Sequence, residues 1–465
     1  MRTAITQARR SGAFVGLKDL VRPQQLPSLA AWYDISDTSS LIYDASNRVA
    51  LVGDKSGNSS TNVLCLNGVA GNYASAPDSV PLSITGDIDI RAYLALDDWT
   101  PSAAHTIIGK IPTTSGQWSY TFDVNTTTGT LLLGWSPNGS SAAVIAKSST
   151  VAPTVANYAG LWIRATLDVD NGAAGNTVTF YTSTDGVAWT QLGDPVVTAG
   201  VTSIFNGTAD VGIGSNSSGV NRVAGLIYRA QIYNGIAGTL VFDANFATAS
   251  KLAPSFTESS SNAATVTINT SGATGARISG ARDLYQGTVA NQPILTIAAA
   301  GNYLTFDGSN DYLKSPAFAL PQPISRYTVG SQVSWTSGDY LWDGASAANS
   351  AALIQTTSTP RLNLNAGSSV AANTGLVLQT LSVISEIFNG AASFLTIARQ
   401  AATTGNAGAG APNGVTIGAS GAATAANFGN ITISEHLVYA ASHGTNFSLR
   451  ILMWLWRKWK PAFNI

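Results

Sequence analysis

Charged side chains are scarce in this sequence. Asp, Glu, Lys and Arg together make up 11% of its 465 residues, against about a quarter in a typical soluble protein. The formal net charge is −1 and no run of Lys or Arg occurs, so the chain has no long-range field to attract nucleic acid. We therefore expect no nucleic-acid partner, and solubility must depend on small polar side chains.

Cysteine and long apolar runs are also lacking. The one cysteine, Cys65, cannot form a disulfide within the chain and is expected to be a small buried side chain. The N-terminal segment has no apolar core of the length that a secretory signal needs. No stretch reaches the ~18 apolar residues of a membrane-spanning helix. The sequence thus predicts a protein made in the cytoplasm, without a secretory signal and without membrane insertion.

The residues that are abundant favour β-structure. The chain is 45% hydrophobic, with 11 Trp, 15 Tyr and 14 Phe, so it has enough apolar surface to form cores. Between about residues 28 and 440, short runs rich in Val, Ile, Thr and Tyr alternate with Gly, Asn, Asp and Ser turns. In residues 226–233, apolar and polar side chains alternate with a period of two, which is typical of a half-buried strand. We predict an all-β protein built from sandwiches.

An internal repeat predicts two copies of one domain. Residues 71–73 (Gly-Asn-Tyr) precede a strand that ends at Trp99, and residues 301–303 (Gly-Asn-Tyr) precede a strand that ends at Trp335. Farther on, two further strands in each half also match. The spacing differs between the halves, as expected when loops vary around a common strand order.

The repeat suggests where the domains begin and end. We expect a first sandwich over residues 27–250 and a second over residues 281–445. The segment 251–280 is rich in Ser, Asn, Thr, Ala and Gly, which predicts a linker. Residues 1–26 are expected to form an N-terminal arm, and residues 446–465 a C-terminal helix packed on the second sandwich.

Helical signal is strong only near the C-terminus. A helix is predicted over Arg450–Trp459, with Asn446 or Ser448 as its N-cap and Pro461 as its stop. The expected role is to cover one face or end of the second sandwich. The alternative, insertion into a membrane or docking into a partner, draws on the basic residues beside the tryptophans. The apolar stripe consists of Ile451, Leu452, Leu455 and Trp459.

Three segments resemble a known family of phage and prophage proteins. Residues 27–37 (PSLAAWYDISD) resemble the entry segment of laminin G-like domains, and residues 303–313 (YLTFDGSNDYL) resemble a strand-turn-strand of the same family. Residues 431–439 followed by 447–459 are similar to its closing strand and basic, aromatic helix. The resemblance implies two tandem jelly-roll sandwiches of the concanavalin A-like kind, as found in bacteriophage virion proteins. The first half departs from the pattern, because residues 72–78 lack the full Phe-Asp-Gly turn.

Two short motifs have competing interpretations. The oxygen groups of residues 307–311 (DGSND) suit calcium, but the segment lacks the downstream Glu of a calcium loop, so a Gly/Asn hairpin turn is favoured. Residues 183–189 (STDGVAW) resemble one sialidase Asp-box turn. A turn at Asp185 and Gly186, with Trp189 packed beneath it, is the favoured interpretation.

No catalytic or metal-binding pattern occurs. Glycoside hydrolysis needs two carboxylates across a groove, whereas Glu258, Glu386 and Glu435 each stand far from another acid in the sequence. His105, His436 and His443 accompany no nucleophile motif, and no Cys/His pair has the spacing of a zinc site. We expect no enzymatic activity, no cofactor and no metal. The many aromatic residues could stack on sugar rings, but the sequence does not single out a carbohydrate-binding residue.

The N-terminal arm is the predicted site of virion attachment. Its basic and apolar side chains would become ordered on contact with another virion protein, although a loose basic terminus is an equal alternative. The residues expected to attach are Arg9, Arg10, Phe14, Leu17, Lys18, Leu20 and Arg22.

The sequence therefore predicts a structural component of a bacteriophage particle, such as a fibre, spike or head-decoration subunit. Its partners would be other virion proteins and a host-surface polysaccharide, and its location would be the virion. A homo-oligomer, a trimer by analogy with phage fibres, is expected. A free bacterial carbohydrate-binding or adhesion protein is the second hypothesis, and a cryptic glycosidase is the third.

Overall fold

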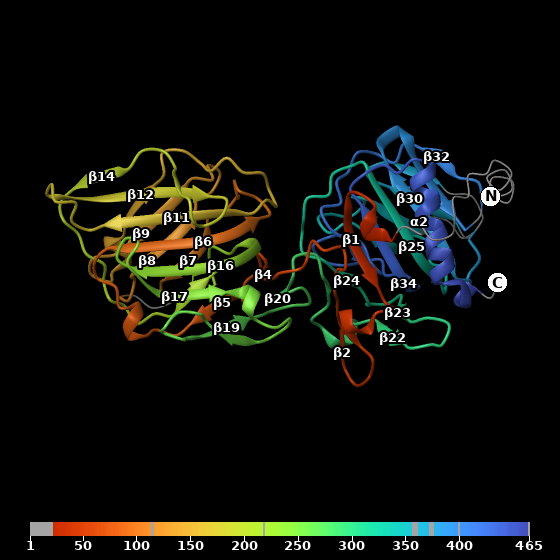
Figure 1. The fold of residues 1–465 in the computed structure, drawn as a ribbon, viewed down its shortest axis with the longest axis horizontal. Helices are drawn as coiled ribbons and strands as arrows, with labels where there is room; N and C mark the ends of the chain where they lie inside the picture. Colours follow the sequence, from red (N-terminus) through yellow and green to blue (C-terminus); the bar gives the residue numbers. More distant parts are fainter. Residues whose placement is uncertain are drawn as a thin grey trace. The chain divides into compact units, whose positions relative to one another are not determined.

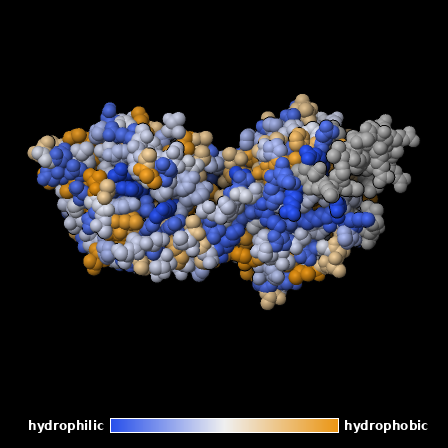
Figure 2. All heavy atoms as spheres, in the orientation of Figure 1, coloured by the Kyte–Doolittle hydropathy of each residue, from blue (hydrophilic) through white to orange (hydrophobic). Residues whose placement is uncertain are grey.

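The computed structural model describes residues 22–112, 116–216, 219–355, 361–371, 376–398 and 400–463. The chain divides into two compact units, of which unit 1 comprises residues 1–60 and 282–465 and unit 2 comprises residues 61–281. Each unit is a sandwich of two antiparallel sheets, so the protein is all-β, as predicted (Figure 1). Figure 2 shows hydrophobic residues only as scattered spots on the visible surface of both units.

Unit 2 contains sheets C and D. The strands of sheet C, in spatial order, are β13 (Thr190–Gln191), β12 (Gly175–Ser183), β11 (Leu161–Asp168), β6 (Ile88–Leu96), β16 (Ala224–Asn234), β4 (Asn62–Asn67) and β20 (Arg277–Gly280), with β14 (Val196–Ala199) beside β12 and β17 (Thr239–Asn245) beside β16. Those of sheet D are β10 (Ile145–Ser148), β9 (Leu131–Trp135), β8 (Tyr120–Val124), β7 (His105–Lys110), β15 (Val211–Ile213), β5 (Tyr73–Ala76), β19 (Thr265–Asn269) and β18 (Ser255–Thr257).

Unit 1 contains sheets A and B. The strands of sheet A are β22 (Ile294–Thr296), β23 (Tyr303–Asp307), β34 (Asn430–Tyr439), β25 (Ile324–Gln332), β30 (Ser382–Phe388), β31 (Ser393–Ile397) and β32 (Thr403–Gly405), with β1 (Leu29–Asp34) also on β34. Those of sheet B are β2 (Leu41–Tyr43), β3 (Val49–Val52), β21 (Leu284–Tyr285), β24 (Leu313–Lys314), β33 (Thr416–Ile417), β26 (Tyr340–Asp343), β27 (Ala352–Gln355), β28 (Leu362–Asn365) and β29 (Ser369–Ala371).

Helical elements are few and short among the described residues. The α-helix is α2 (Thr445–Lys458). The 3-10 turns are η1 (Pro23–Gln25), η2 (Thr38–Ser40), η3 (Val80–Leu82), η4 (Ser141–Ala143), η5 (Phe246–Thr248), η6 (Val289–Asn291), η7 (Gly390–Ala392) and η8 (Lys460–Phe463). The N-cap of α2 is Gly444 and not Asn446 or Ser448, and Pro461 lies within η8.

Strand alternation explains the core of unit 2. On β6, every second residue from Ile88 to Leu96 is apolar and buried between sheets C and D. The residues between them, Asp89, Arg91 and Tyr93, belong to the outer face of sheet C. A strand with one apolar and one polar face therefore fixes which side of the sheet becomes core.

The interior of unit 1 includes a buried polar cluster. Arg326 of β25 pairs with Glu386 of β30 at 2.5 Å, and the Trp342 indole N–H donates to the other Glu386 oxygen at 2.7 Å. Burial raises the pKa of Glu386, against the effect of Arg326. Thr328 bonds to the ring of His436 at 2.8 Å in the same interior. Glu386, isolated in the sequence, is thus a core residue paired with an arginine.

The expected domain boundaries are wrong at the start of the chain. Residues 27–60 belong with the C-terminal half, because β1 pairs with β34 through partners such as Trp32 and Leu437. β2 and β3 likewise complete sheet B, where β3 pairs with β21. Unit 2 is therefore inserted into unit 1 after residue 60. Sequence order alone favoured tandem domains, since the partner of β1 lies about 400 residues away.

The expected linker is also wrong. Within residues 251–280 the structure has three strands of unit 2, with β18 on β19, β19 on β5 and β20 on β4. Val266 and Ile268 of β19 are buried, while Thr265 and Thr267 are exposed. Thr265 and Thr267, two of the small polar residues that suggested a linker, form the outer face of this strand.

The two units have equivalent strands, as the internal repeat predicts, but the residues that correspond differ from those that the sequence match paired. β4 corresponds to β23 and β5 to β24, because each pair holds the same place beside the later strands β16 and β34, or β15 and β33. The counterpart of Tyr73 is consequently Tyr312, and not Tyr303 as the shared Gly-Asn-Tyr tripeptide suggested. The shared tripeptide stands at different places in the two units, at the start of β5 in unit 2 and at the start of β23 in unit 1.

Most of the predicted attachment residues lie outside the described part of the chain. These are Arg9, Arg10, Phe14, Leu17, Lys18 and Leu20. Arg22 is described and exposed, and its backbone N–H donates to the Gln25 side chain at 2.7 Å. The attachment role stays a prediction.

Candidate functional site

Helix α2 covers part of the outer face of sheet A. It contacts β25 and β30, and its apolar stripe includes Ile451, Leu455 and Trp459 (Figure 1). The helix is thus held to the sheet by burial of its stripe. The side chains beneath it are Trp32, Tyr327, Val329, Val383, Leu437 and Tyr439.

A buried carboxylate fixes the end of this helix. Glu435 of β34 accepts the indole N–H of Trp32 at 2.7 Å and that of Trp459 at 2.5 Å. The Lys458 ammonium lies 2.9 Å from it. Burial raises the pKa of Glu435 to about 7, and Lys458 counteracts that rise. Both carboxylate oxygens are therefore occupied by donors from β1 and α2.

Lys458 also joins the helix to the first strand. Its ammonium contacts Asp34 of β1 at 2.6 Å, and Lys55 contacts the other Asp34 oxygen at 3.1 Å. Burial acts to raise the pKa of Asp34, but these lysines outweigh it and the pKa is lowered. A small ionic network therefore joins the first strand of unit 1, β1, to its C-terminal helix, α2.

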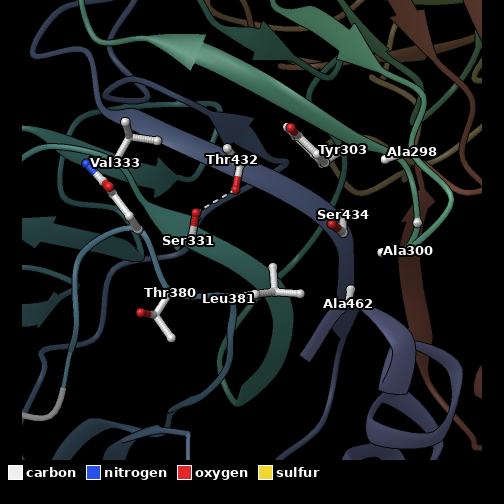
Figure 3. Close-up of a pocket in the computed structure, with 12 residues that line it drawn as sticks. Ala298, Ala300, Tyr303, Ser331, Val333, Thr380, Leu381, Thr432, Ser434 and Ala462 are labelled. Carbon is white, nitrogen blue, oxygen red and sulfur yellow. Dashed lines mark hydrogen bonds between the residues drawn. The ribbon is translucent and has the colours of Figure 1, made fainter. Parts of the chain in front are cut away.

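Beyond the end of α2 the same face is hollowed into a pocket. Its volume is about 530 Å³. Strands β23, β25 and β34 and the segment after α2 contribute to its walls (Figure 3). The polar lining residues are Tyr303, Ser331, Gln379, Thr380, Thr432 and Ser434, and the others are Ala298, Ala300, Gly301, Val333, Leu381 and Ala462.

Strand geometry positions the hydroxyl groups. Thr432 and Ser434 are two residues apart on β34, and Ser331 lies on β25 directly opposite Thr432. The Ser331 and Thr432 hydroxyls are 2.7 Å apart and share a hydrogen bond, drawn as a dashed line in Figure 3. A β-bulge between Val329 and Gly330 shifts the register next to this pair. The bulge is therefore part of what shapes the pocket.

Gly301 joins the pocket to the helix. Its φ is +129°, and a Cβ at this position would collide with the Trp459 ring. Only glycine combines that backbone conformation with so close an approach. The wall around residues 298–301 is thus set by the position of Trp459, which Glu435 holds in turn.

The chemistry of the pocket is polar but uncharged. Among the described residues that line it, none carries a carboxylate, ammonium or guanidinium group. Hydroxyl groups both donate and accept hydrogen bonds, and the Gln379 amide does the same. The lining therefore suits a neutral ligand that carries many hydroxyl groups.

The two motifs with competing interpretations form turns. The Asp307 carboxylate accepts backbone N–H groups of Ser309 at 2.8 Å and Asn310 at 3.1 Å. The turn runs from β23 in sheet A to β24 in sheet B, so it joins the two sheets and is not a hairpin. Across the described ranges, no three His, Cys, Asp or Glu side chains gather as ligands for a metal ion.

The segment resembling an Asp box is likewise a turn. The Asp185 carboxylate accepts the N–H groups of Val187 at 2.8 Å and Ala188 at 2.9 Å. Trp189 then meets the Trp162 ring edge to face, with ring centroids 6.3 Å apart. Packing of Trp189 on the sheet thus follows the prediction.

The isolated acids and histidines of the sequence are not brought together. Glu258 accepts backbone N–H groups of Asp243 and Ser260 within unit 2. His443 bonds to the Tyr327 hydroxyl at 3.0 Å in unit 1, and burial lowers its pKa to about 4. Glu258 and His443 thus have structural partners. No α-helix among the residues that the structure describes is both long enough and apolar enough to cross a lipid bilayer.

The pocket residues were missed by the sequence analysis. Ser331, Thr432 and Ser434 look like ordinary outward residues of a strand, and Leu381 and Ala462 come from segments far apart in the chain. The one available signal was the alternation of Thr432 and Ser434 on a predicted strand.

No protein-family model matches the chain, and no curated protein does either. Similar solved structures include a carbohydrate-binding protein of Bacteroides ovatus, described as putative, at 13% identity and a TM-score of 0.32, covering 47% of this chain and 60% of that one. Domains LG4-5 of the mouse laminin α1 chain match at 9% identity and a TM-score of 0.29, covering 84% of this chain and 89% of that one. Trypanosoma rangeli sialidase matches at 10% identity and a TM-score of 0.27, covering 70% of this chain and 67% of that one. Because these TM-scores are below 0.5, the fold class rests on the sheets themselves.

Proposed function

We propose that this chain is a structural subunit of a bacteriophage particle and that its unit 1 pocket binds a neutral saccharide of the host surface. The observation that carries the binding proposal is the uncharged, hydroxyl-lined pocket beside α2. Its volume of about 530 Å³ lies within the range of pockets that bury small ligands.

The lining matches the chemistry of a neutral sugar. Hydroxyls of Tyr303, Ser331 and Thr432 come from three adjacent strands, so they are held by the sheet and not by flexible loops. Sugar hydroxyls need partners that donate and accept, which these groups provide. A charged ligand would be desolvated here without a compensating charge, which costs several kcal/mol.

Binding without turnover is part of the proposal. The nearest carboxylate along β34, Glu435, is engaged by Trp32, Trp459 and Lys458. A glycosidase needs one carboxylic acid and one carboxylate that reach the substrate, and the described residues that line this pocket include neither. The absence of enzymatic activity stays a prediction.

The virion assignment is supported by the sequence resemblance to phage laminin G-like proteins. In this proposal the N-terminal arm contacts other virion proteins, the subunits form a homo-oligomer and the sandwiches are displayed to the host. The free bacterial adhesion protein remains the competing hypothesis, because the same pocket would serve it equally well.

The test of the pocket uses hydroxyl deletions. The full chain is screened against immobilised neutral saccharides, and the best ligand is titrated by calorimetry. Thr432→Val and Tyr303→Phe each remove one hydroxyl at nearly constant volume, so each is expected to weaken binding about three- to tenfold.

The matched control is Thr396→Val on β31 of the same sheet, which does not line the pocket. It should leave the affinity within about twofold, because its hydroxyl is remote from the ligand. Failure of every neutral saccharide to bind, or an equal loss in Thr396→Val, would contradict the proposal.

A further inference from the structure

The outer face of sheet C in unit 2 carries a paired arginine site. Arg91 on β6 and Arg164 on β11 both bind the carboxylate of Asp89, with nitrogen to oxygen distances of 2.7 to 3.0 Å. The Asp89 side chain is fully buried, while those of Arg91 and Arg164 are 13% and 11% exposed. Burial would raise the pKa of Asp89, but the two arginines lower it.

The charges of this site are not balanced. Two guanidinium groups share one carboxylate, which leaves one positive charge. Each arginine uses Nε and Nη2 on Asp89, and neither Nη1 group makes a hydrogen bond within the described residues. The nearby Arg229 is neutralised by Asp243 at 2.6 Å. The unused donors therefore belong to Arg91 and Arg164.

Aromatic rings surround the two guanidinium groups. Arg91 lies over the rings of Tyr233 at 4.1 Å and Trp189 at 5.5 Å. Arg164 lies over Tyr181 at 4.7 Å and over the same Trp189 at 5.6 Å. These rings are half-buried, and they fix the planes of the guanidinium groups. The donors are consequently held in place before any ligand arrives.

A second row of rings continues across the sheet. Tyr93 stacks on Trp162 with ring centroids 5.4 Å apart, and it meets the Tyr228 ring at a tilt with centroids 4.5 Å apart. The rings of both rows come from β12, β11, β6 and β16 and from the turn after β12, so they extend about 14 Å across the strands. A surface of this length suits an extended chain better than a small anion.

The equivalent face of unit 1 is used differently. On β25, Tyr327 takes the place that Arg91 takes on β6, since both strands lie against a bulge in their long neighbour. There the face is apolar and α2 covers it. Among the described residues of unit 2 no α-helix does so.

We propose that this face of unit 2 binds a polysaccharide that carries carboxylate groups, such as a polyuronic acid, with Arg91 and Arg164 as its anchors. A ligand carboxylate can accept charge-assisted hydrogen bonds from the Nη1 groups that Asp89 leaves unused, and the surrounding rings provide contact for the sugar. The site is distinct from the neutral pocket of unit 1, so either can fail without the other. An acidic peptide is disfavoured because aromatic rings flanking the charges suit sugar rings as partners.

The experiment titrates the full chain with oligogalacturonate and with its methyl ester, which has the same backbone without charge. The free acid should bind at least about tenfold more tightly than the ester. Arg91→Met should remove most of this difference. The variant should fold, because Asp89 keeps its bonds to Arg164 and to the Ala237 N–H.

The control is Arg222→Met, an exposed arginine of unit 2 whose change removes the same charge away from the rings. It should leave the affinity for the free acid unchanged, and thermal unfolding checks that both variants fold. Equal binding of acid and ester, equal losses in the two variants, or equally tight binding of oligoglutamate would overturn the proposal. If Thr432→Val weakened binding of the free acid and Arg91→Met did not, this proposal would also be overturned. The proposal for the unit 1 pocket would still stand.

Discussion

Glu435 is the residue on which the candidate pocket of unit 1 depends most. It lies at the end of a chain of contacts, from its carboxylate to the Trp459 indole and from the Trp459 ring to Gly301. Its burial is complete, so its ionisation is coupled to folding. The position of the pocket wall thus depends on a group whose pKa is raised to about 7.

The pH dependence of stability tests this arrangement. The unfolded-state pKa of a glutamate is near 4.5, so the folded protein binds the proton more tightly between about pH 4.5 and 7. The contribution of Glu435 to the free energy of unfolding should therefore fall as pH rises through this window, by about 3 kcal/mol. Glu435→Gln, which does not titrate, should lack that fall.

The measurement is denaturant unfolding of both proteins at several pH values. Groups that do not interact with Glu435, such as Asp311 with its raised pKa, contribute equally to both curves, so the difference between wild type and variant reports on Glu435 and on the groups coupled to it, Lys458 and Asp34. Parallel curves from pH 4.5 to 8 would show that the carboxylate does not titrate with folding.

At the same scale, the sequence predicted turns well and pocket residues poorly. The turns at Asp307 and Asp185 depend on local backbone N–H groups, so a few neighbouring residues determine them. The pocket depends on which strands become neighbours, and Ser331 meets Thr432 across about 100 residues. Local patterns carry no information on that pairing.

Strand pairing explains how unit 2 is inserted. β4 and β20, the first and last strands of unit 2, pair with each other, and Asn62 lies opposite Gly280. In unit 1, the Arg282 N–H donates to the Ser59 hydroxyl at 2.9 Å. The segment that leaves unit 1 and the segment that comes back to it are therefore held side by side by local contacts. Domain insertions are tolerated when the two connections lie close together.

This topology predicts which fragments fold. Residues 61–281 contain both sheets of unit 2 and their whole core, so they should fold alone and unfold cooperatively. Residues 27–250 should not, because they lack β18, β19 and β20 and carry β1 without its partner β34. Circular dichroism and thermal unfolding of the two fragments decide between the inserted and the tandem arrangement.

The C-terminal helix shows why some features of an element were predicted better than others. The C-terminal helix was expected over Arg450–Trp459, and α2 begins five residues earlier at Thr445. Ser448, one expected cap, uses its hydroxyl on Tyr327 at 2.9 Å. Tertiary contacts therefore replaced a local capping preference, whereas the apolar stripe that drives packing was read correctly.

The whole molecule combines two sandwiches whose outer faces differ in chemistry. Unit 1 offers an uncharged pocket beside a covering helix, and unit 2 offers a paired arginine site among aromatic rings. The internal repeat predicted similar sandwiches but not this difference, because it arises from side chains on equivalent strands and from a helix present on one face.

The virion proposal is tested with the whole chain. The full-length protein should be a defined oligomer that associates with phage particles, and a chain that begins at Pro27 should lose this association because it lacks the predicted attachment residues. Sedimentation with purified particles and measurement of solution mass check both. Monomers that ignore particles yet bind a host polysaccharide would favour the free adhesion protein.

The most direct test of the central claim is a crystal structure of the full chain with the neutral saccharide that binds it best. The sugar should lie in the unit 1 pocket, with hydrogen bonds to the hydroxyls of Ser331 and Thr432 and contact with Tyr303. A sugar bound elsewhere, with this pocket free of it, would contradict the proposed function.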